Sequence, residues 1–219
     1  MTGDLAIEHF LEICDSASWT PGRIPESTEQ ESADYLVTAE GTIFLAEIKQ
    51  LNPNREEREK ERQIQLGKVV VHHHTPGDRL RPLIKKANRQ IRALAAPGQP
   101  GLLVVYDTRR VSPVEPYDAL TAMYGLQNVV LNVHPDPRVP PSYAGNRFGG
   151  GRSVSSSYNR SVSALGIVPQ QPRPARVMYV FHNAFAASCL PSEILRIPGF
   201  RQFRRPHSES SDFNEWQEF

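Results

Sequence analysis

Two acidic residues and a lysine occur in one short stretch, where their types and spacing could support metal-ion chemistry. Asp34, Glu47 and Lys49 lie in the segment A-D-Y-L-V-T-A-E-G-T-I-F-L-A-E-I-K. This segment predicts a tight β-hairpin that turns at Glu40-Gly41. With that turn, residues whose numbers add up to 81 face each other, so that Asp34 lies directly opposite Glu47.

The predicted hairpin brings all three side chains to one face of a sheet. Directly opposed residues have Cβ atoms roughly 4.5–5.5 Å apart. Glu47 and Lys49 share a face because they are two residues apart on one strand. The second strand is almost continuously apolar up to Glu47, which is typical of a strand buried on both faces. Opposed like charges destabilise a hairpin, so the pair of acids predicts a cation bound between them.

A hard divalent cation such as Mg²⁺ or Mn²⁺ prefers oxygen ligands. The carboxylates of Asp34 and Glu47 and the backbone carbonyl of Ile48 supply such ligands. The metal would lower the pKa of a bound water, and Lys49 would orient or deprotonate that water or stabilise the charge on phosphorus. This set fits phosphodiester hydrolysis. A plain surface hairpin, with both acids paired to Lys49 and nearby arginines, is the alternative, but it does not explain acids ending a buried strand.

The series Asp34, twelve further residues and Glu47-Ile48-Lys49 resembles the signature of the PD-(D/E)XK nuclease superfamily, which has the restriction endonuclease-like fold. The resemblance implies an αβββαβ core with the two motif halves on neighbouring antiparallel strands. It covers about residues 4–107. Ala33 stands where many members have proline, and an insertion of about thirty residues precedes the core helix.

The resemblance also implies helper residues at the metal site. Many members add a glutamate from the first helix, and Glu8 matches that place best, with Glu12 and Glu31 as alternatives. Some members carry a polar residue on the core helix that reaches the site, for which Gln90 is the candidate. Each of these assignments follows from the resemblance alone.

The predicted elements describe an α/β protein with a mixed central sheet flanked by helices. With the resemblance, we expect residues 1–219 to form a single nuclease domain, with the core at about 4–107 and further strands, a mobile loop and a tail over 108–219. We predict helices at 4–14, 53–66, 79–95 and 116–124, and strands, besides the hairpin, at 68–74, 101–107, 129–134, 164–168 and 175–182. Pro21-Gly22 predicts a turn, and 135–160, rich in Pro, Gly, Ser and Arg, predicts the mobile loop.

Two predictions concern charged and histidine-rich segments of this region. The run R-E-E-R-E-K-E-R within 53–66 predicts a helix that is solvated on every side. The three histidines 72–74 indicate the polar end of a strand rather than a metal site, because neighbouring strand residues point to opposite faces.

Charge and composition restrict the partners. The net charge is +1, so there is no global basic field. The segment 79–92 is nevertheless basic without an acid, and a nucleic acid, with DNA preferred, would contact Lys85, Lys86, Arg89, Gln90 and Arg92. The same residues also fit a solvated helix face. A homodimer is possible, since cutting both strands of a duplex usually takes two sites.

The location of the protein is predicted from simple features. The N-terminal residues lack a basic stretch followed by a long apolar run, which predicts no signal peptide. No apolar run approaches the roughly 20 residues that span a bilayer. The two cysteines, Cys14 and Cys189, have no ligand spacing and suit a reducing cytoplasm.

The sequence therefore predicts a cytoplasmic nuclease that needs Mg²⁺ or Mn²⁺ and hydrolyses DNA. The alternative is a catalytically inactive nucleic-acid-binding or assembly protein on the same fold. An RNA-directed nuclease is a third reading. The sequence leaves open the substrate's shape, any recognition sequence, and endonuclease or exonuclease action.

Overall fold

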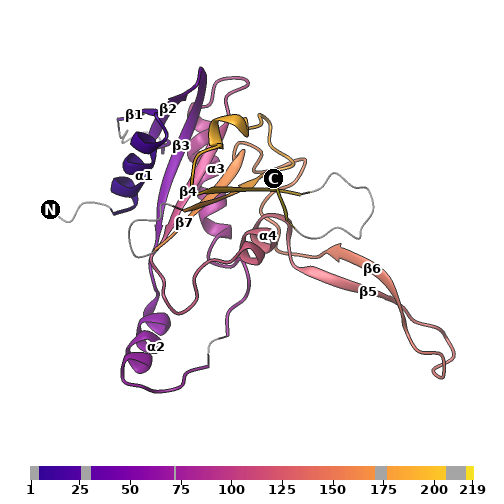
Figure 1. The fold of residues 1–219 in the computed structure, drawn as a ribbon. Coiled ribbons are helices and arrows are strands. Elements are labelled where there is room, and N and C mark those ends of the chain that lie inside the picture. Colours follow the sequence, from indigo (N-terminus) through magenta and orange to yellow (C-terminus); the bar gives the residue numbers. More distant parts are fainter. Residues whose placement is uncertain (1–4, 26–30, 72, 171–176, 206–215) are drawn as a thin grey trace.

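A mixed β-sheet of eight strands with helices on both faces forms the body of the protein in a computed structural model (Figure 1). The structure describes residues 5–25, 31–71, 73–170, 177–205 and 216–219. It confirms the predicted α/β class with a mixed central sheet. Asp4, His72 and residues 175–176, for which the sequence made predictions, lie outside these ranges.

The described elements follow each other in an order that contains the expected αβββαβ succession, with one helix inserted before the core helix. They are α1 (Leu5–Ser16), β1 (Thr20–Arg23), β2 (Tyr35–Ala39), β3 (Thr42–Leu51), α2 (Arg55–Gln65), α3 (Arg81–Leu94), β4 (Gly101–Asp107), α4 (Pro116–Tyr124), β5 (Gln127–Asn132), β6 (Ser142–Phe148), β7 (Ala164–Pro169), β8 (Met178–His182), η1 (Glu193–Leu195), β9 (Phe200–Arg204) and β10 (Gln217–Glu218).

The strand order in the sheet is β1-β2-β3-β4-β7-β8-β9-β10. The central strands β3, β4 and β7 run parallel, and antiparallel pairs flank them on both sides. All seven residues of β4 are buried, as expected for a central strand of a parallel sheet covered on both faces. The carboxyl ends of β3 and β4 therefore meet at one edge of the sheet, where ligands commonly bind in open α/β sheets.

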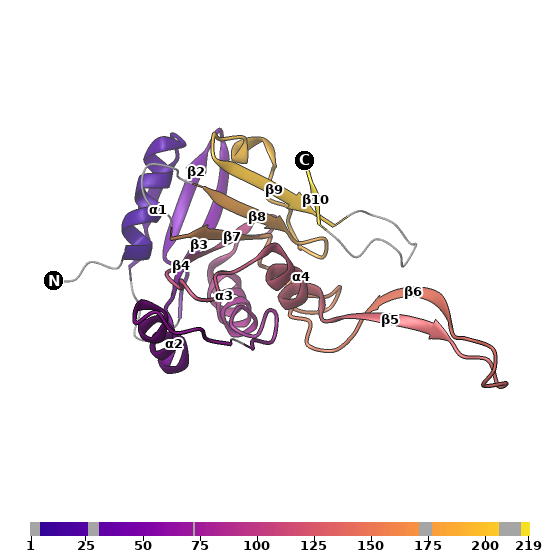
Figure 2. The same ribbon diagram turned by 60° about the horizontal axis from the view of Figure 1, so that its bottom comes forward.

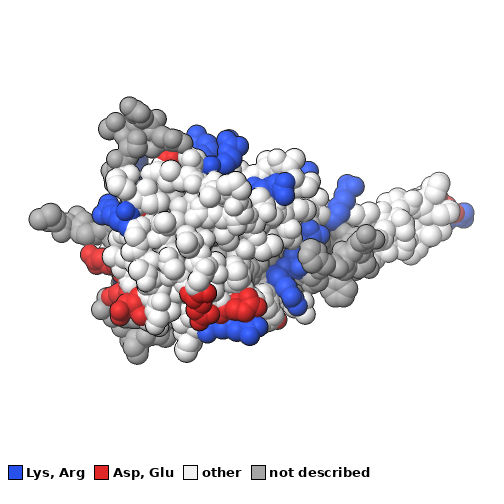
Figure 3. Space-filling model, turned by 90° about the horizontal axis from the view of Figure 1, so that it is seen from above, with Lys and Arg blue, Asp and Glu red and all other residues white. Residues whose placement is uncertain are grey.

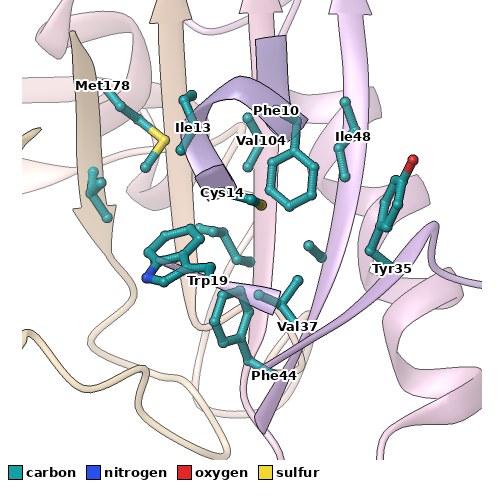
Figure 4. Close-up of a cluster of buried hydrophobic side chains, with 14 of the residues drawn as sticks. Phe10, Ile13, Cys14, Trp19, Tyr35, Val37, Phe44, Ile48, Val104 and Met178 are labelled. Carbon is teal, nitrogen blue, oxygen red and sulfur yellow. The ribbon is translucent and has the colours of Figure 1, made fainter. Parts of the chain in front are cut away.

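Helix α1 covers one face of the sheet, and α3 and α4 cover the other (Figure 2). On the α1 face, Phe10 and Cys14 pack with Ile48 and Val104 from β3 and β4 (Figure 4). On the opposite face, α3 buries Ile84, Ala87 and Ile91 against side chains that include Leu45, Leu51, Leu103 and Val105. Since side chains alternate along a strand, Glu47 and Lys49 point to the α3 face together with Leu45 and Leu51.

Three predictions about irregular segments were wrong. Pro21-Gly22 is part of β1, an edge strand that pairs with β2, rather than a turn. The described residues of 68–74 form no strand. The segment 135–160 is not only a loop, because it contains β6, which pairs with β5. In the described part of the chain, no helix combines the length and apolar character required to cross a bilayer.

Candidate active site

The hairpin that carries the candidate residues forms with the predicted turn and register. Glu40 and Gly41 have φ of 46° and 81°, the left-handed pair of a two-residue hairpin turn. Strand pairs run from Ala39↔Thr42 to Tyr35↔Ala46, so the register prediction is confirmed along β2. The regular ladder ends there, and Asp34 comes one residue before β2.

Two hydrogen bonds fix Asp34 against β3. Its backbone N–H donates to the carbonyl of Ala46 at 3.1 Å. Its side-chain Oδ2 accepts from the N–H of Ile48 at 2.7 Å. Because the N–H and C=O of one strand residue point toward the same neighbour, the Ile48 carbonyl faces the same side of β3 as Asp34. The carboxylate of Asp34 therefore lies beside the Glu47-Ile48-Lys49 segment.

Glu47 is the most unusual residue of the site. Its side chain is completely buried, and its Oε1 accepts from the ammonium group of Lys49. Its Oε2 is buried and accepts from none of the described residues. Burial raises the pKa of Glu47 to about 7, against the effect of Lys49. The negative charge of Asp34 raises this pKa further, as does the hydrogen bond that a protonated Glu47 can donate to Asp34. A buried carboxylate oxygen without a partner is unfavourable, and such groups usually have an explanation.

A divalent cation fits this donor set. It would satisfy the free oxygen of Glu47 and relieve the repulsion between the two carboxylates. Within the described residues, no group of three or more His, Cys, Asp and Glu side chains could hold a metal. The protein ligands would therefore be two carboxylates and the Ile48 carbonyl, and water or phosphate would complete the shell, as is usual for Mg²⁺. The side chain of Lys49 is 19% exposed, so that a substrate can reach it.

The structure does not bring the expected third acid to the site. Glu8 is exposed on α1, which packs on the opposite face of the sheet from Glu47. Glu12 lies on the same helix, 3.5 Å from His9. Glu31 is 3.6 Å from Arg89 of α3. The residues 31–34 and α3 are thus close together, but no third carboxylate among the described residues converges on Asp34 and Glu47.

Gln90, in contrast, reaches the segment that leads into the site. It is buried on α3, and its Nε2 donates to the carbonyl of Ser32 at 3.2 Å. Its Oε1 is buried and accepts from no described residue. The other candidates for nucleic-acid contacts, Lys85, Lys86, Arg89 and Arg92, are exposed on the outer side of α3.

A second polar cluster, at the carboxyl ends of β3 and β4, was missed by sequence reasoning. Asp107 accepts from Arg109 at 2.8 and 3.1 Å. Arg109 also reaches Glu57 at 3.4 Å, and Glu57 accepts from Arg79 at 2.8 Å. We call Glu57, Arg79, Asp107 and Arg109 the paired cluster. The prediction that α2 is solvated on every side was wrong, because Glu57 is only 3% exposed.

Two sequence signals could have located the paired cluster. Asn54 and Glu57 form a capping box at the start of α2, and the pattern N-x-x-E is a known helix start. Asp107 is the polar last residue of the apolar strand β4. Glu47 is similar, because it follows the apolar part of β3. Beside the cluster lies a pocket of about 170 Å³, whose lining includes Arg79, Arg109, His73, His74 and Asp118. His74 lies 3.3 Å from Asp118. The prediction that the three histidines end a strand was wrong for His73 and His74, which lie in no strand, and His72 is outside the described residues.

No protein family model, curated protein or solved structure matches this chain. Its function must therefore be inferred from the geometry of its own residues.

Proposed function

We propose that this protein is a nuclease that depends on a divalent metal ion and hydrolyses phosphodiester bonds in DNA. The observation that carries the proposal is the buried, unpartnered Oε2 of Glu47 next to the carboxylate of Asp34. A bound cation would satisfy this oxygen and offset the charges of the two neighbouring carboxylates, of which Glu47 is fully buried and Asp34 partly buried. The order of α1, β1–β3, α3 and β4, and the resemblance in sequence, support the same proposal.

Each residue has a separate task in this proposal. Asp34, Glu47 and the Ile48 carbonyl would hold Mg²⁺ or Mn²⁺. When bound, the ion would lower the pKa of a water and offset charge on a phosphate oxygen. Lys49 is oriented by its hydrogen bond to Glu47 and lies on the same sheet face. Its partly exposed amine would orient or deprotonate the attacking water, or stabilise the charge that develops on phosphorus.

The exposed side of α3 would bind the backbone of the nucleic acid. Lys85, Lys86, Arg89 and Arg92 can approach phosphates without reading bases, which would hold the substrate beside the site. Gln90 has a different task, because it is buried. Its bond to Ser32 would hold the segment before Asp34 in position.

Cleavage assays with matched variants test this proposal. The purified protein, with Mg²⁺ or Mn²⁺, would be offered single-stranded, duplex and branched DNA, and RNA. We expect cleavage of DNA that is abolished by Glu47→Gln and by Lys49→Met. Glu40→Gln, which changes an exposed carboxylate in the turn of the same hairpin, should cleave like the unmodified protein. A contaminating nuclease would be present in all four preparations, so equal cleavage by all four contradicts the proposal, as does cleavage by none.

The alternative is a nucleic-acid-binding or assembly protein without catalysis. The absence of a third acid near Asp34 and Glu47, among the described residues, favours this alternative. It predicts that DNA binding is the same with Mg²⁺ and with a chelator. It also predicts that Asp34→Asn and Glu47→Gln leave that binding unchanged.

A further inference from the structure

The hairpin of β5 and β6, residues 127–148, projects from the body and is called the arm here (Figures 1 and 2). It leaves the body next to α4, and both views show its tip as the part of the hairpin farthest from the sheet. Its strands pair with each other in a separate two-stranded sheet. An isolated two-stranded hairpin is marginally stable in water, so an arm of this kind usually requires further packing.

One face of the arm carries large exposed apolar side chains, although Gln127 belongs to it and Asn146 is the cross-strand partner of Val129. Val129 and Leu131 share a face because they alternate on β5, and they are 64% and 51% exposed. Val133 follows one residue after the end of β5, continues the alternation in sequence and is 75% exposed. Tyr143, the cross-strand partner of Leu131, is 58% exposed and belongs to the same face. These four side chains are called the apolar arm face.

The other face of the arm is called the polar face. Asn128 and Asn132 of β5 lie on it with their partners Arg147 and Ser142 of β6, and Val130, which is only partly exposed, lies between them opposite Gly145. The more exposed apolar side chains of the arm are therefore on the first face. No residue in the described part of the chain packs over the apolar arm face, since its four side chains are all more than half exposed.

At its root, the same face continues into the body. Phe148 pairs with Gln127 in the ladder and so shares the face of Val129. Its ring packs on Tyr124 of α4, with ring centres 5.9 Å apart. The face is thus covered where it meets the body and uncovered farther out. An exposed apolar surface of this size is typical of a binding surface.

Charge argues against a nucleic acid as the occupant of this face. Between residues 127 and 148 the charged side chains are Asp136, Arg138 and Arg147. Asp136 and Arg138 pair with each other at 2.8 Å, and Arg147 lies on the polar face. On the side drawn in Figure 3, the outer part of the arm shows charged atoms only at its tip. A polyanion is bound by neutralising its phosphates, which this face cannot do.

We propose that a second copy of this chain covers the apolar arm face, so that two arms pack face to face around a two-fold axis. The order Val129, Leu131, Val133 is symmetric about its centre. An axis through the middle residue would place Leu131 against Leu131 of the partner subunit, and Val129 against Val133 of the partner subunit. Such self-matching is what a two-fold interface requires. The contact has no charged residue at its centre, so nothing in it repels the second copy.

The size of the contact sets the expected strength. Covering the apolar arm face on both copies would bury on the order of 1,000 Å², which is at the lower limit for a specific protein interface. We therefore expect a dimer that forms reversibly as the concentration rises. This inference is independent of the proposed nuclease activity.

Analytical ultracentrifugation over a hundredfold range of protein concentration tests the proposal. We expect the unmodified protein to pass from monomer to dimer and Leu131→Lys to stay monomeric throughout. Asn132→Lys adds the same charge one residue further, on the polar face, and should dimerise like the unmodified protein. A monomer at all concentrations overturns the proposal, because something other than a second copy must then cover the face. Equal dimerisation of Leu131→Lys and Asn132→Lys also overturns it.

Crosslinking keeps the proposal testable if Leu131→Lys disturbs the arm. In a Cys189→Ser background, which removes the exposed cysteine, Leu131→Cys should form a disulfide-linked dimer upon mild oxidation. Asn132→Cys should not, because its side chain would point away from the partner arm. Cys14 is buried and does not interfere. Equal crosslinking at the two positions, or none at either, contradicts the face-to-face arrangement.

Discussion

Glu47 and Glu57 are ten residues apart and both almost completely buried, at 0% and 3% exposure, yet their surroundings are opposite. Glu57 accepts hydrogen bonds from the backbone of Asn54 and from two arginines, Arg79 and Arg109. Glu47 accepts from Lys49 alone among the described residues and keeps one free oxygen. The carboxylate of Glu57 is fully hydrogen-bonded, whereas that of Glu47 keeps an oxygen that accepts no hydrogen bond from the described residues.

The pKa values of the two residues reflect this difference. Burial favours the neutral form of both. In Glu57, the bonds from Asn54 and Arg79 and the charges of Arg79 and Arg109 outweigh burial and lower the pKa. In Glu47, burial dominates over Lys49, and the pKa rises to about 7. The comparison teaches that burial alone does not distinguish the two acids, whereas the missing partner of Glu47 does. The pocket beside the paired cluster is lined by charges that already have partners.

The largest expected effect concerns stability. Arg109→Met would leave Asp107 without its two side-chain bonds and Glu57 without one arginine. Breaking a buried ion pair on one side typically costs about 3–5 kcal/mol of unfolding free energy. Urea denaturation should show this loss, while Arg110→Met, at the exposed neighbouring position, should change stability by less than about 0.5 kcal/mol. Equal stability of the two variants would show that the paired cluster does not hold the fold.

The second prediction is a pH dependence of stability that belongs to Glu47. Its pKa rises from 4.5 to about 7 on folding, so the folded state binds its proton more tightly than the unfolded state. The metal-free protein should therefore be most stable below pH 4.5 with respect to this group, and lose stability as the pH rises through about 7. The loss is on the order of 3 kcal/mol by linkage.

Denaturation curves with a chelator at several pH values would measure this effect against Glu47→Gln. The variant cannot ionise at this position, so the difference between the two proteins should grow between pH 4.5 and about 7 in the variant's favour. Saturating Mn²⁺ should remove the difference by stabilising the unmodified protein. If the stabilities of the two proteins changed equally with pH in the absence of metal, burial would not raise the pKa of Glu47.

The smallest expected effect concerns DNA binding by the residues around Asp34 and Glu47. Lys86→Gln on the exposed side of α3 should weaken DNA binding by less than about tenfold and reduce the salt dependence by about one counterion. Lys68→Gln, at an exposed position between α2 and α3, should change neither. Fluorescence anisotropy at several salt concentrations would separate the two. A larger effect of Lys68→Gln would place the DNA elsewhere on the surface.

The features of the site that depend on neighbouring residues in the sequence could be predicted. The Glu40-Gly41 turn defines the register, and the register brings Asp34 next to the strand of Glu47. The partners of Glu57 come from residues 79 and 109, which no local pattern connects with α2. The resemblance suggested Glu8 for the site, but only the packing of α1 shows that it lies on the other face. Strand β6 was missed because Gly, Ser and Pro conceal its pairing with β5.

Isothermal titration of the metal-free protein with Mn²⁺ tests the central claim most directly. We expect a single ion to bind per chain and Glu40→Gln to bind like the unmodified protein. Asp34→Asn should weaken binding at least about tenfold, because even the loss of a residue that only supports a metal ligand typically costs about 10–100-fold. The absence of Mn²⁺ binding, or equal binding by Asp34→Asn and the unmodified protein, would contradict the claim that Asp34 and the free oxygen of Glu47 form a metal site.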